Sequence, residues 1–365
     1  MTKFVVRQIL RQAARILSWL LYFVTIMSAY GGYFNPERWT LPAIGVLFFP
    51  YLAILSLIVA AIWLIRRHFF IGGAGILMLM ACGPTFVEAL PFRFGHTPSN
   101  PEKTFRMVTF NCLHMNDQKN KSPKLNRSLH FLIHSDADFI CLQELYAVGQ
   151  PEIPAKYDSQ IDSLLKIYPY YSKDGSREIE FLSKYPFRQI NLKIEDDVQY
   201  GNCAAYEFTI DGNALTVVNV HLPSYLLSEK ERTIITEAHS KAGVKKSIRQ
   251  FEGSVYRKMR AAFRERGKVA KSIAEYASSV EGNVIVCGDF NDVPGSWSYR
   301  NFTKRGFDDA YAETGFGHII TYNQHLMWFH IDQILYKGNL IPLYVRKERL
   351  NSSDHYPIVA EFEFM

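Results

Sequence analysis

The sequence predicts an α/β fold, in which a two-layer β-sandwich flanked by helices follows a segment of three apolar helices. The first observation is a change in composition near residue 93. Before it the chain contains long runs almost free of charge, and after it the composition is that of a soluble protein. The second observation is that many strand-like stretches alternate with few helix-like ones in the later part. This mixture, in a unit of this length, favours two sheets packed face to face with helices outside.

The first 94 residues are predicted to be a membrane anchor. Three apolar runs each have about the 20 residues that a helix needs to cross the hydrocarbon core of a bilayer, and they cover about 13–33, 43–65 and 69–90. The basic start resembles that of a signal peptide, but two further apolar runs follow and no compact cleavage site does. Apart from Glu88 near the end of the third run, no acid or base lies in mid-span, so anchoring is favoured over solute transport.

Basic residues are distributed unevenly along the chain. The first 100 residues contain eight Lys/Arg and two acids. Their difference, 8 − 2 = +6, equals the net charge of the whole chain. The rest of the chain is therefore net neutral, and the basic pI is no evidence for nucleic-acid binding. Six of the eight basic residues are at the start of the chain or between the second and third runs, at Lys3, Arg7, Arg11, Arg15, Arg66 and Arg67. The turn between the first two runs has only Arg38 with Glu37, and Arg93 follows the third run. The positive-inside rule then predicts a cytoplasmic N-terminus and an extracytoplasmic domain, in a plasma or inner membrane.

A stretch rich in Pro, Gly and Ser at 95–101 is predicted to be a linker, and 102–365 to be one domain. Apolar runs and alternating patterns in this domain predict strands at 105–111, 139–142, 180–182, 204–210, 215–220, 284–287, 331–336 and 358–364. Helices are expected at 125–134 and 255–279. The segment Lys230–Lys271 contains thirteen Lys/Arg and four Glu. It is either a solvated helix face or a patch for anionic headgroups or substrate.

Polar side chains that are poor strand formers recur where these predicted strands end. They are Asn111, Gln143, Glu144, Asn219, His221, Asp289, Asn291, Asp332, Ser353, Asp354 and His355. One Asp after a strand is usually a turn residue, but repetition at six strand ends indicates a shared site. The five cysteines form no CxxC and no zinc-like spacing, so a metal site built on sulfur is not expected.

Four motifs make the sequence similar to the endonuclease/exonuclease/phosphatase superfamily: LQE at 142–144, NVHL at 219–222, GDFN at 288–291 and SDH at 353–355. The superfamily includes deoxyribonucleases, abasic-site endonucleases, inositol polyphosphate 5-phosphatases and neutral sphingomyelinases. The resemblance extends from about Phe105 to the C-terminus. It implies a four-layer α/β sandwich with two central sheets, and metal-dependent hydrolysis of a phosphate ester.

Such hydrolysis needs a hard cation, a water activated in line with the leaving oxygen, and an acid for that oxygen. Oxygen ligands without thiolates indicate Mg²⁺ or Mn²⁺. Glu144 is the best candidate ligand, with Asn111 and Asp354 in support. The resemblance assigns the remaining roles.

By that resemblance, Asp289 orients or deprotonates the attacking water, and Asn291 positions the water and a phosphate oxygen. His355, paired with Asp332, would be a cation that neutralises charge at the phosphorus centre. His221 would donate to a phosphoryl oxygen or to the leaving group.

The sequence departs from the family in two places. Where many members carry a small, Gly-bearing stretch, this chain has Glu178 and Glu180, which point the same way on a strand. One of them is hypothesised to support His221, as a carboxylate does in some nucleases of the family, and surface exposure is the alternative. His330 stands where an Arg often precedes the motif Asp, which leaves substrate contact at that point open.

The expected function is hydrolysis of a phosphodiester or phosphomonoester near the membrane, with a lipid headgroup favoured as substrate. A membrane-bound nuclease acting on extracellular DNA or RNA is the alternative within the same enzyme class. A catalytically inactive membrane scaffold is the alternative of a different class, although none of the core positions is missing.

Overall fold

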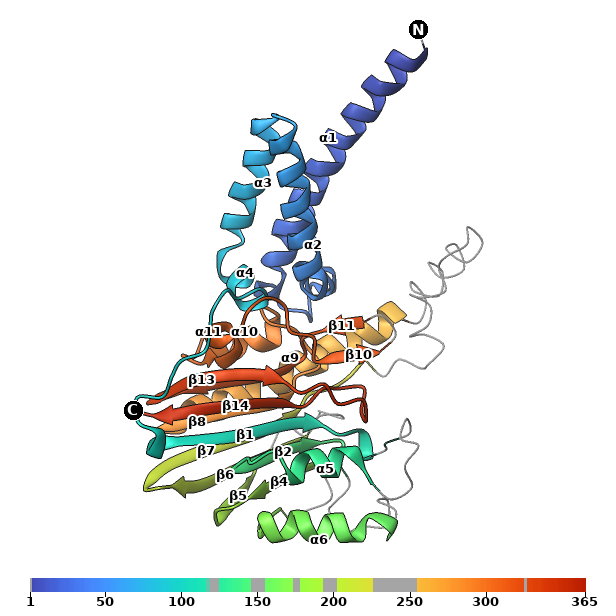
Figure 1. The fold of residues 1–365 in the computed structure, drawn as a ribbon. Coiled ribbons are helices and arrows are strands. Elements are labelled where there is room, and N and C mark those ends of the chain that lie inside the picture. The colour runs from blue at the N-terminus through green and yellow to red at the C-terminus, as the bar shows by residue number, and fades with distance from the viewer. Residues whose placement is uncertain are drawn as a thin grey trace.

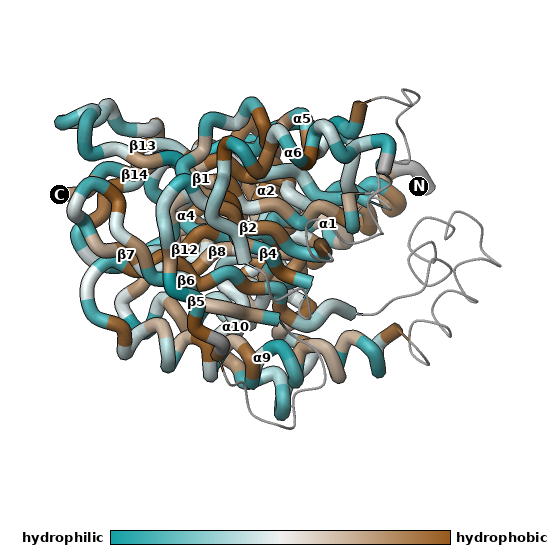
Figure 2. The backbone as a smooth tube through the Cα atoms, turned by 90° about the horizontal axis from the view of Figure 1, so that it is seen from below, coloured by the Kyte–Doolittle hydropathy of each residue, from teal (hydrophilic) through white to brown (hydrophobic). Residues whose placement is uncertain are grey.

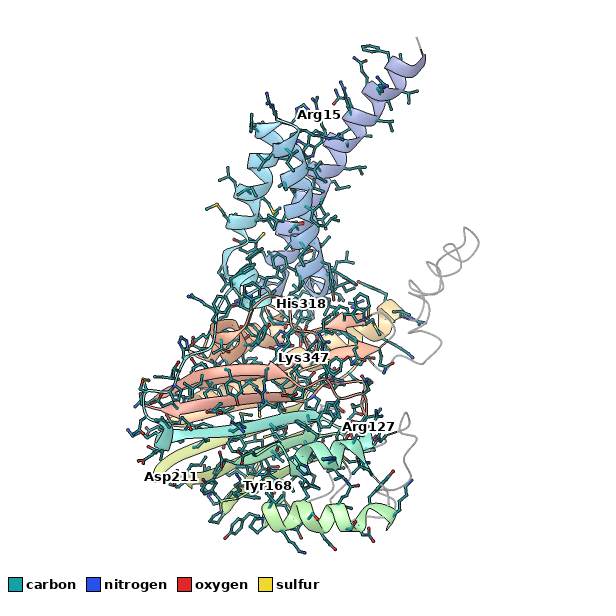
Figure 3. The ribbon with its side chains drawn as sticks, in the orientation of Figure 1. Arg15, Arg127, Tyr168, Asp211, His318 and Lys347 are labelled. Atoms are coloured by element: carbon teal, nitrogen blue, oxygen red, sulfur yellow. The ribbon has the colours of Figure 1, made fainter. Side chains whose placement is uncertain are left out.

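The computed structural model describes residues 2–115, 117, 125–145, 155–172, 178–192, 202–225, 255–324 and 327–365. Two parts are visible in Figure 1: a bundle of apolar helices, and a strand-rich domain that sits directly against one end of the bundle. Side chains labelled in Figure 3 mark this layout. His318 lies at the junction of the two parts, whereas Tyr168 and Asp211 lie on the far side of the domain.

The helical part consists of α1 (Thr2–Ala29), α2 (Thr40–Ile65), α3 (Phe69–Ala81) and α4 (Gly83–Ala89), with the short 3-10 turn η1 (Gly31–Tyr33) after α1. Two stretches, Phe4–Tyr33 and Thr40–Ile65, are long and apolar enough to cross a membrane. The third apolar run bends by 78° between α3 and α4, and the number of such spans rises to three if this bent pair counts as one. Gly83 at positive φ and Pro84, which lacks an N–H, explain the break.

The domain contains two six-stranded sheets among the described residues. The first has the order β13-β14-β1-β2-β4-β3 and the second β5-β6-β7-β8-β12-β9. Strands of the first sheet are β1 (Thr104–Asn111), β2 (Phe139–Gln143), β3 (Tyr170–Tyr171), β4 (Ile179–Ser183), β13 (Leu340–Lys347) and β14 (Ile358–Phe364). Those of the second are β5 (Phe187–Asn191), β6 (Asn202–Ile210), β7 (Asn213–His221), β8 (Asn283–Asp289), β9 (Asp308–Asp309) and β12 (Asp332–Lys337).

Helices cover the outer face of each sheet, which confirms the predicted four-layer α/β sandwich. Apolar residues of the two sheets, such as Phe139, Phe181 and Tyr206, pack against one another in a central core. The first sheet packs outward on α5 (Arg127–Ile133) and α6 (Asp158–Ile167). The second packs outward on α9 (Tyr256–Ser279) and α10 (Trp297–Thr303). Figure 2 shows these helix pairs on opposite sides of the strands.

The segment 95–101, predicted as a linker, lies along the edge of the domain. The backbone N–H of His96 donates to the carbonyl of Leu343 at 2.7 Å, and the N–H groups of Ser99 and Asn100 donate to the Glu363 carboxylate at 2.8 and 2.7 Å. These bonds hold the connection between the two parts in a defined path.

Arg300 of α10 joins the domain to the helical part. Its guanidinium donates to both carboxylate oxygens of Glu88 in α4 at 2.6 Å and to Thr85 Oγ1 at 3.0 Å. It also lies over the ring of Tyr33, 4.8 Å from the ring centroid. Nearby the backbones touch, since a Cβ at Gly32 would be 1.7 Å from the carbonyl oxygen of Gly295. The domain is therefore docked on the helices.

We expect Arg300→Ala to destabilise the protein by about 3–5 kcal/mol, because it leaves the Glu88 carboxylate largely buried without its charge partner. The measurement is thermal unfolding of the purified protein in detergent. Arg305→Ala is the matched control, because that guanidinium pairs with Glu275 at an exposed site, where a pair contributes about 0–1 kcal/mol. Equal, small shifts in Tm for both variants would contradict the docking role.

Candidate active site

Strand register brings the polar strand ends together at one end of the domain. In the second sheet, His221 of β7 pairs with Asp289 of β8, and Asp289 pairs with Asp332 of β12. In the first sheet, Asn111 of β1 pairs with Gln143 of β2. Parallel pairing of β1 with β2 and of β7 with β8 makes each pair end at the same edge.

Hydrogen bonds across the two sheets fix this edge. Asn111 Nδ2 donates to Glu144 Oε1 at 2.9 Å and to Asp289 Oδ2 at 3.0 Å. Beneath it, Gln143 Nε2 donates to Asn219 Oδ1 at 2.7 Å, and Asn219 Nδ2 donates to the carbonyls of Leu142 and Glu180. Asn219 therefore acts as a buried tie between the sheets.

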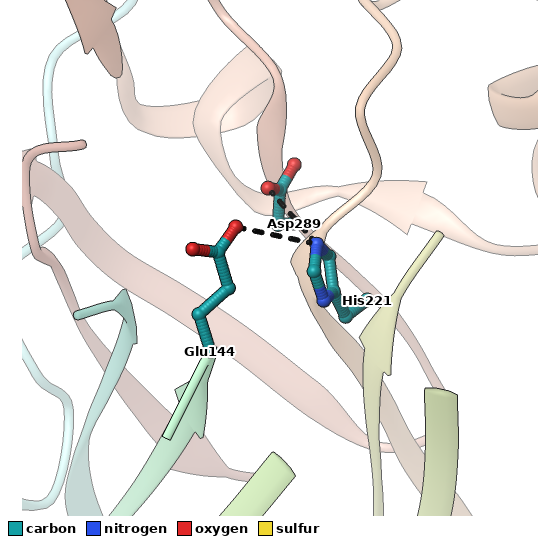
Figure 4. A group of neighbouring side chains, drawn as sticks. All are labelled: Glu144, His221 and Asp289. Carbon is teal, nitrogen blue, oxygen red and sulfur yellow. Dashed lines mark ion pairs between the residues drawn. The ribbon is translucent and has the colours of Figure 1, made fainter. Parts of the chain in front are cut away.

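Glu144, His221 and Asp289 form one group of possible metal ligands, shown in Figure 4. His221 Nε2 lies 3.7 Å from Glu144 Oε1 and 3.8 Å from Asp289 Oδ2. These separations exceed those of hydrogen bonds, and the ligand atoms lie within 4.8 Å of one another. The group combines two carboxylates with an imidazole, and none of the five buried free cysteines belongs to it. Its two carboxylates are ligands that a hard divalent cation prefers, whereas the imidazole is not.

His355 and Asp332 form a buried pair beside this group. His355 Nδ1 lies 2.9 Å from Asp332 Oδ2, and His355 Nε2 lies 3.6 Å from Asp289 Oδ2. Burial opposes protonation, but the charges of Asp332 and Asp289 outweigh it and raise the pKa of His355 well above its usual value. This shift favours the charged form of the imidazole. Ser353 orients it, because its Oγ accepts from the His355 N–H and donates to the carbonyl of Asn111.

Asp289 is the centre of the site and is only 1% exposed. Burial raises the pKa of its carboxyl group, and the nearby positive charge of His355 opposes that shift. Asp289 Oδ1 accepts the N–H of Asn291 at 2.8 Å, and Asn291 Nδ2 donates to the carbonyl of Leu222 at 2.9 Å. Asn291 has φ +49°, a backbone conformation that Asn tolerates better than most residues.

Asp354 lies at the rim of the same site. Together with Glu144, Asp289, Asn291 and His355, it lines one cavity. Among the described residues it belongs to neither group of close metal-ligand atoms, which are Glu144–His221–Asp289 and Asp289–Asp332–His355. The structure thus brings all eight predicted site residues to one region, with Asp354 outside the two tight clusters.

The two departures from the family pattern lie in different surroundings. Glu180 is fully buried, and its Oε2 accepts from Ser172 Oγ at 2.7 Å, so surface exposure does not apply to it. Glu178 has φ +55°, and its carbonyl accepts the N–H of Leu145, next to Glu144. Support of His221 by either carboxylate stays a prediction. His330 is buried, its ring packs against Tyr311, and burial lowers its pKa well below the usual value.

Several residues at the site carry no strong signal in the sequence. The guanidinium of Arg266 in α9 is fully buried, 3.7 Å from Asp292, and stacked 4.5 Å from the ring centroid of Tyr225. In the sequence, only the acidic residue Asp292 in the GDFND stretch could have indicated that a basic partner lies nearby. The cavity is also lined by Leu47 of the apolar helix α2, and by Met327 and Phe329 of β11 (Met327–Phe329).

The basic segment Lys230–Lys271 is described from residue 255 onward, and residues 230–254 lie outside the described residues. In the described part, basic side chains occupy the exposed face of α9 at Arg257, Arg260, Arg264 and Lys271, whereas Arg266 faces the core. Whether the exposed basic residues form a solvated face or a patch for anionic groups stays a prediction.

Comparisons with known proteins identify the family of the domain. A family model described as "Endonuclease/Exonuclease/phosphatase family" matches residues 108–355, and one described as "Domain of unknown function (DUF8431)" matches residues 8–86. No curated protein matches the sequence significantly.

Similar solved structures include TDP2 from D. rerio complexed with a single-strand DNA product, at 16% identity and a TM-score of 0.48, covering 71% of this chain and 99% of that one. An endonuclease/exonuclease/phosphatase from Bacteroides vulgatus has 17% identity and a TM-score of 0.46, covering 72% and 99%. Beta toxin from Staphylococcus aureus has 16% identity and a TM-score of 0.40, covering 70% and 99%.

Proposed function

This chain belongs to the endonuclease/exonuclease/phosphatase family, and we propose that it is a membrane-anchored, divalent-metal-dependent phosphoesterase. The observation that carries the proposal is the proximity of Glu144, His221, Asp289 and the Asp332–His355 pair, of which Glu144, Asp289 and His355 line one cavity. These groups supply the charge, the base and the proton donor that attack on a phosphate ester requires.

Each side chain has a role that its position supports. Glu144, with Asn111 and Asp354, would hold Mg²⁺ or Mn²⁺, which when bound neutralises charge on the phosphate. Asp289 takes the proton of the attacking water, and Asn291 holds that water in line. These two lie in contact through the Asn291 N–H.

The two histidines deal with negative charge that develops during the reaction. His355, held cationic by Asp332, stabilises the phosphorus centre at its transition state. His221 lies 3.7 Å from Glu144 and 3.8 Å from Asp289, and it donates to a phosphoryl oxygen or the leaving oxygen. Water attack and leaving-group protonation therefore use different side chains.

Anchoring in a plasma or inner membrane is the second part of the proposal. The apolar stretches Phe4–Tyr33 and Thr40–Ile65 support it. Basic residues at the N-terminus and between α2 and α3 lie at the end of the bundle away from the domain, and Figure 3 labels Arg15 near that end. Cytoplasmic placement of these residues would put the domain on the extracytoplasmic side. A phosphate ester at that membrane surface, such as a lipid headgroup, is the favoured substrate.

We expect the purified full chain in detergent to hydrolyse bis-p-nitrophenyl phosphate with Mg²⁺ or Mn²⁺, and to lose this activity with EDTA. Restoring the cation should restore the rate, because the oxygen-rich donor set fits such a cation. Release of p-nitrophenol is the measurement. Hydrolysis that survives EDTA would contradict the metal dependence, and no hydrolysis with any divalent cation would favour an inactive scaffold.

A substrate panel then separates the alternatives. Phospholipid vesicles, plasmid DNA, RNA and inositol phosphates are offered at matched phosphate concentration with Mg²⁺. The proposal predicts the highest kcat/KM for the lipid. Faster cleavage of plasmid DNA or RNA would instead make the protein a membrane-bound nuclease.

A further inference from the structure

The cavity that contains the catalytic groups is lined by both polar and apolar side chains. Glu144, Asp289 and His355 are among the polar ones. Four apolar side chains also line it: Leu47, Met327, Phe329 and Ile331. Of these, Leu47 comes from the apolar helix α2, and the others come from β11 and the segment just before β12.

Helix α2 and the hairpin of β10 (Tyr322–Gln324) and β11 are held together beside the cavity. The ring of Phe48 lies 6.0 Å from that of Phe329, and the Tyr51 hydroxyl donates to the carbonyl of Trp328. Leu47 belongs to a buried cluster that also contains Tyr322 and Ile331. The membrane-spanning helix is thus a structural wall of the site.

Leu47, which lines the cavity, is followed on α2 by Phe48, which lies outside the cavity lining. Tyr322 stands next to the catalytic His355, with ring centroids 5.1 Å apart, and Leu47 packs in the same cluster as Tyr322. One residue on, Phe48 is 43% exposed and lies on α2 at the level of the hairpin. A hydrocarbon chain beside Leu47 and Phe329 would therefore reach both the catalytic groups and the bilayer.

The chemistry of this wall selects among phosphate esters. Leu47, Met327, Phe329 and Ile331 carry no side-chain hydrogen-bonding group, so this part of the lining offers no partner for a sugar hydroxyl or a base edge, although Ser224 and Tyr225 line the same cavity. A hydrocarbon chain next to the phosphate would instead pack against these side chains. Both apolar surfaces would then be buried away from water, which is favourable. These apolar side chains suit a phosphate ester whose alcohol carries acyl or alkyl chains.

We propose that Leu47, with Met327 and Phe329, forms a subsite for the hydrocarbon nearest the scissile phosphate, and that the substrate is a phosphate-ester lipid drawn from the membrane in which α2 sits. This inference rests on the proposed phosphoesterase function. It assigns a role in substrate selection to a helix that sequence patterns treat only as an anchor.

The test compares two chromogenic diesters, p-nitrophenyl methyl phosphate and p-nitrophenyl dodecyl phosphate, with the purified full chain in mixed micelles and Mg²⁺. The wild type should prefer the dodecyl ester in kcat/KM by about tenfold or more. Leu47→Ser should reduce this ratio several-fold, and the volume-conserving Leu47→Met should keep it. Leu41→Ser is the matched control on the same helix, because Leu41 is 71% exposed, and it should leave the ratio unchanged.

A second readout does not depend on turnover. A dodecyl phosphonate with a photoreactive diazirine near its phosphorus should label wild-type peptides that contain Leu47 or Phe329, and excess unlabelled dodecyl phosphate should prevent this. Because this readout uses only the wild-type chain, its result does not depend on how well any variant folds.

The outcomes separate the subsite from the enzyme. Hydrolysis of both esters at equal kcat/KM, with no labelling of α2, would overturn the subsite and leave the phosphoesterase intact. Failure to hydrolyse either ester with Mg²⁺ would overturn both. Loss of the ratio in Leu41→Ser as well as in Leu47→Ser would assign the preference to membrane partitioning and would also overturn the subsite.

Discussion

Asp289→Asn should lower kcat/KM for bis-p-nitrophenyl phosphate by about a thousandfold. General base catalysis contributes about 10²–10⁴ in rate, and an amide cannot accept the proton of the attacking water. The Asn oxygen can still accept the N–H of Asn291. Its amide NH2 then faces Asn111 Nδ2, which donates to Asp289 Oδ2 in the wild type, so a lower Tm is also expected. The measurement is Mg²⁺-dependent p-nitrophenol release, combined with thermal unfolding.

Asp211→Asn is the control for this experiment. Asp211 is exposed in a turn with φ +48°, where Asn is equally suited, and Figure 3 shows it on the far side of the domain from the junction with the helices. It should retain full activity. An Asp289→Asn protein that retains more than about half of the wild-type rate would refute Asp289 as the base.

Asp332→Asn should lower kcat/KM at pH 7.5 by about a hundredfold and should move the alkaline limb of the pH–rate profile to lower pH. The charge of Asp332 is the largest factor that raises the pKa of His355, and burial alone would lower it. Without that charge the pKa of His355 falls, so a smaller fraction of the imidazole is charged to offset charge on the phosphate. The measurement is kcat/KM across pH 5–9, with histidine NMR to follow the imidazole.

The same pair sets a pH dependence of stability. Because the folded-state pKa of His355 is raised, its contribution is fully present below the unfolded value of about 6.5 and is lost as pH rises through the folded pKa. The difference in Tm between wild type and Asp332→Asn should therefore shrink at alkaline pH. A difference that stays constant across this range, with an unmoved rate profile, would show that Asp332 is only structural.

The catalytic edge could be predicted because it follows from strand geometry. Side chains that follow parallel neighbouring strands lie at the same edge of the sheet. Asn111, Glu144, His221 and Asp289 could be identified because each is a polar residue at the end of an apolar run. The pairing of His355 with Asp332 came from the family motif and agrees with the 2.9 Å contact. The four-layer fold followed from the same resemblance.

Other features could not be predicted because they depend on contacts distant in sequence. Leu47 has the same sequence signature whether it faces lipid or a cavity. Glu88 forms an ion pair with Arg300, which is 212 residues away in the sequence, and a count of charged residues cannot reveal this pair. Arg266 lies among many other basic residues, so the sequence does not show which of them is buried. In the structure it is buried and lies 3.7 Å from Asp292.

Binding of Mn²⁺ and phosphate, followed by electron paramagnetic resonance, tests most directly whether these strand ends bind one cation beside a phosphate. The wild-type chain with inorganic phosphate should show bound Mn²⁺ with hyperfine coupling to ³¹P. Glu144→Gln should weaken Mn²⁺ binding by about tenfold or more, and Glu313→Gln, whose carboxylate instead accepts from the Tyr336 hydroxyl, should not. Equal Mn²⁺ affinity in the two variants, with no phosphorus coupling in the wild type, would contradict the account.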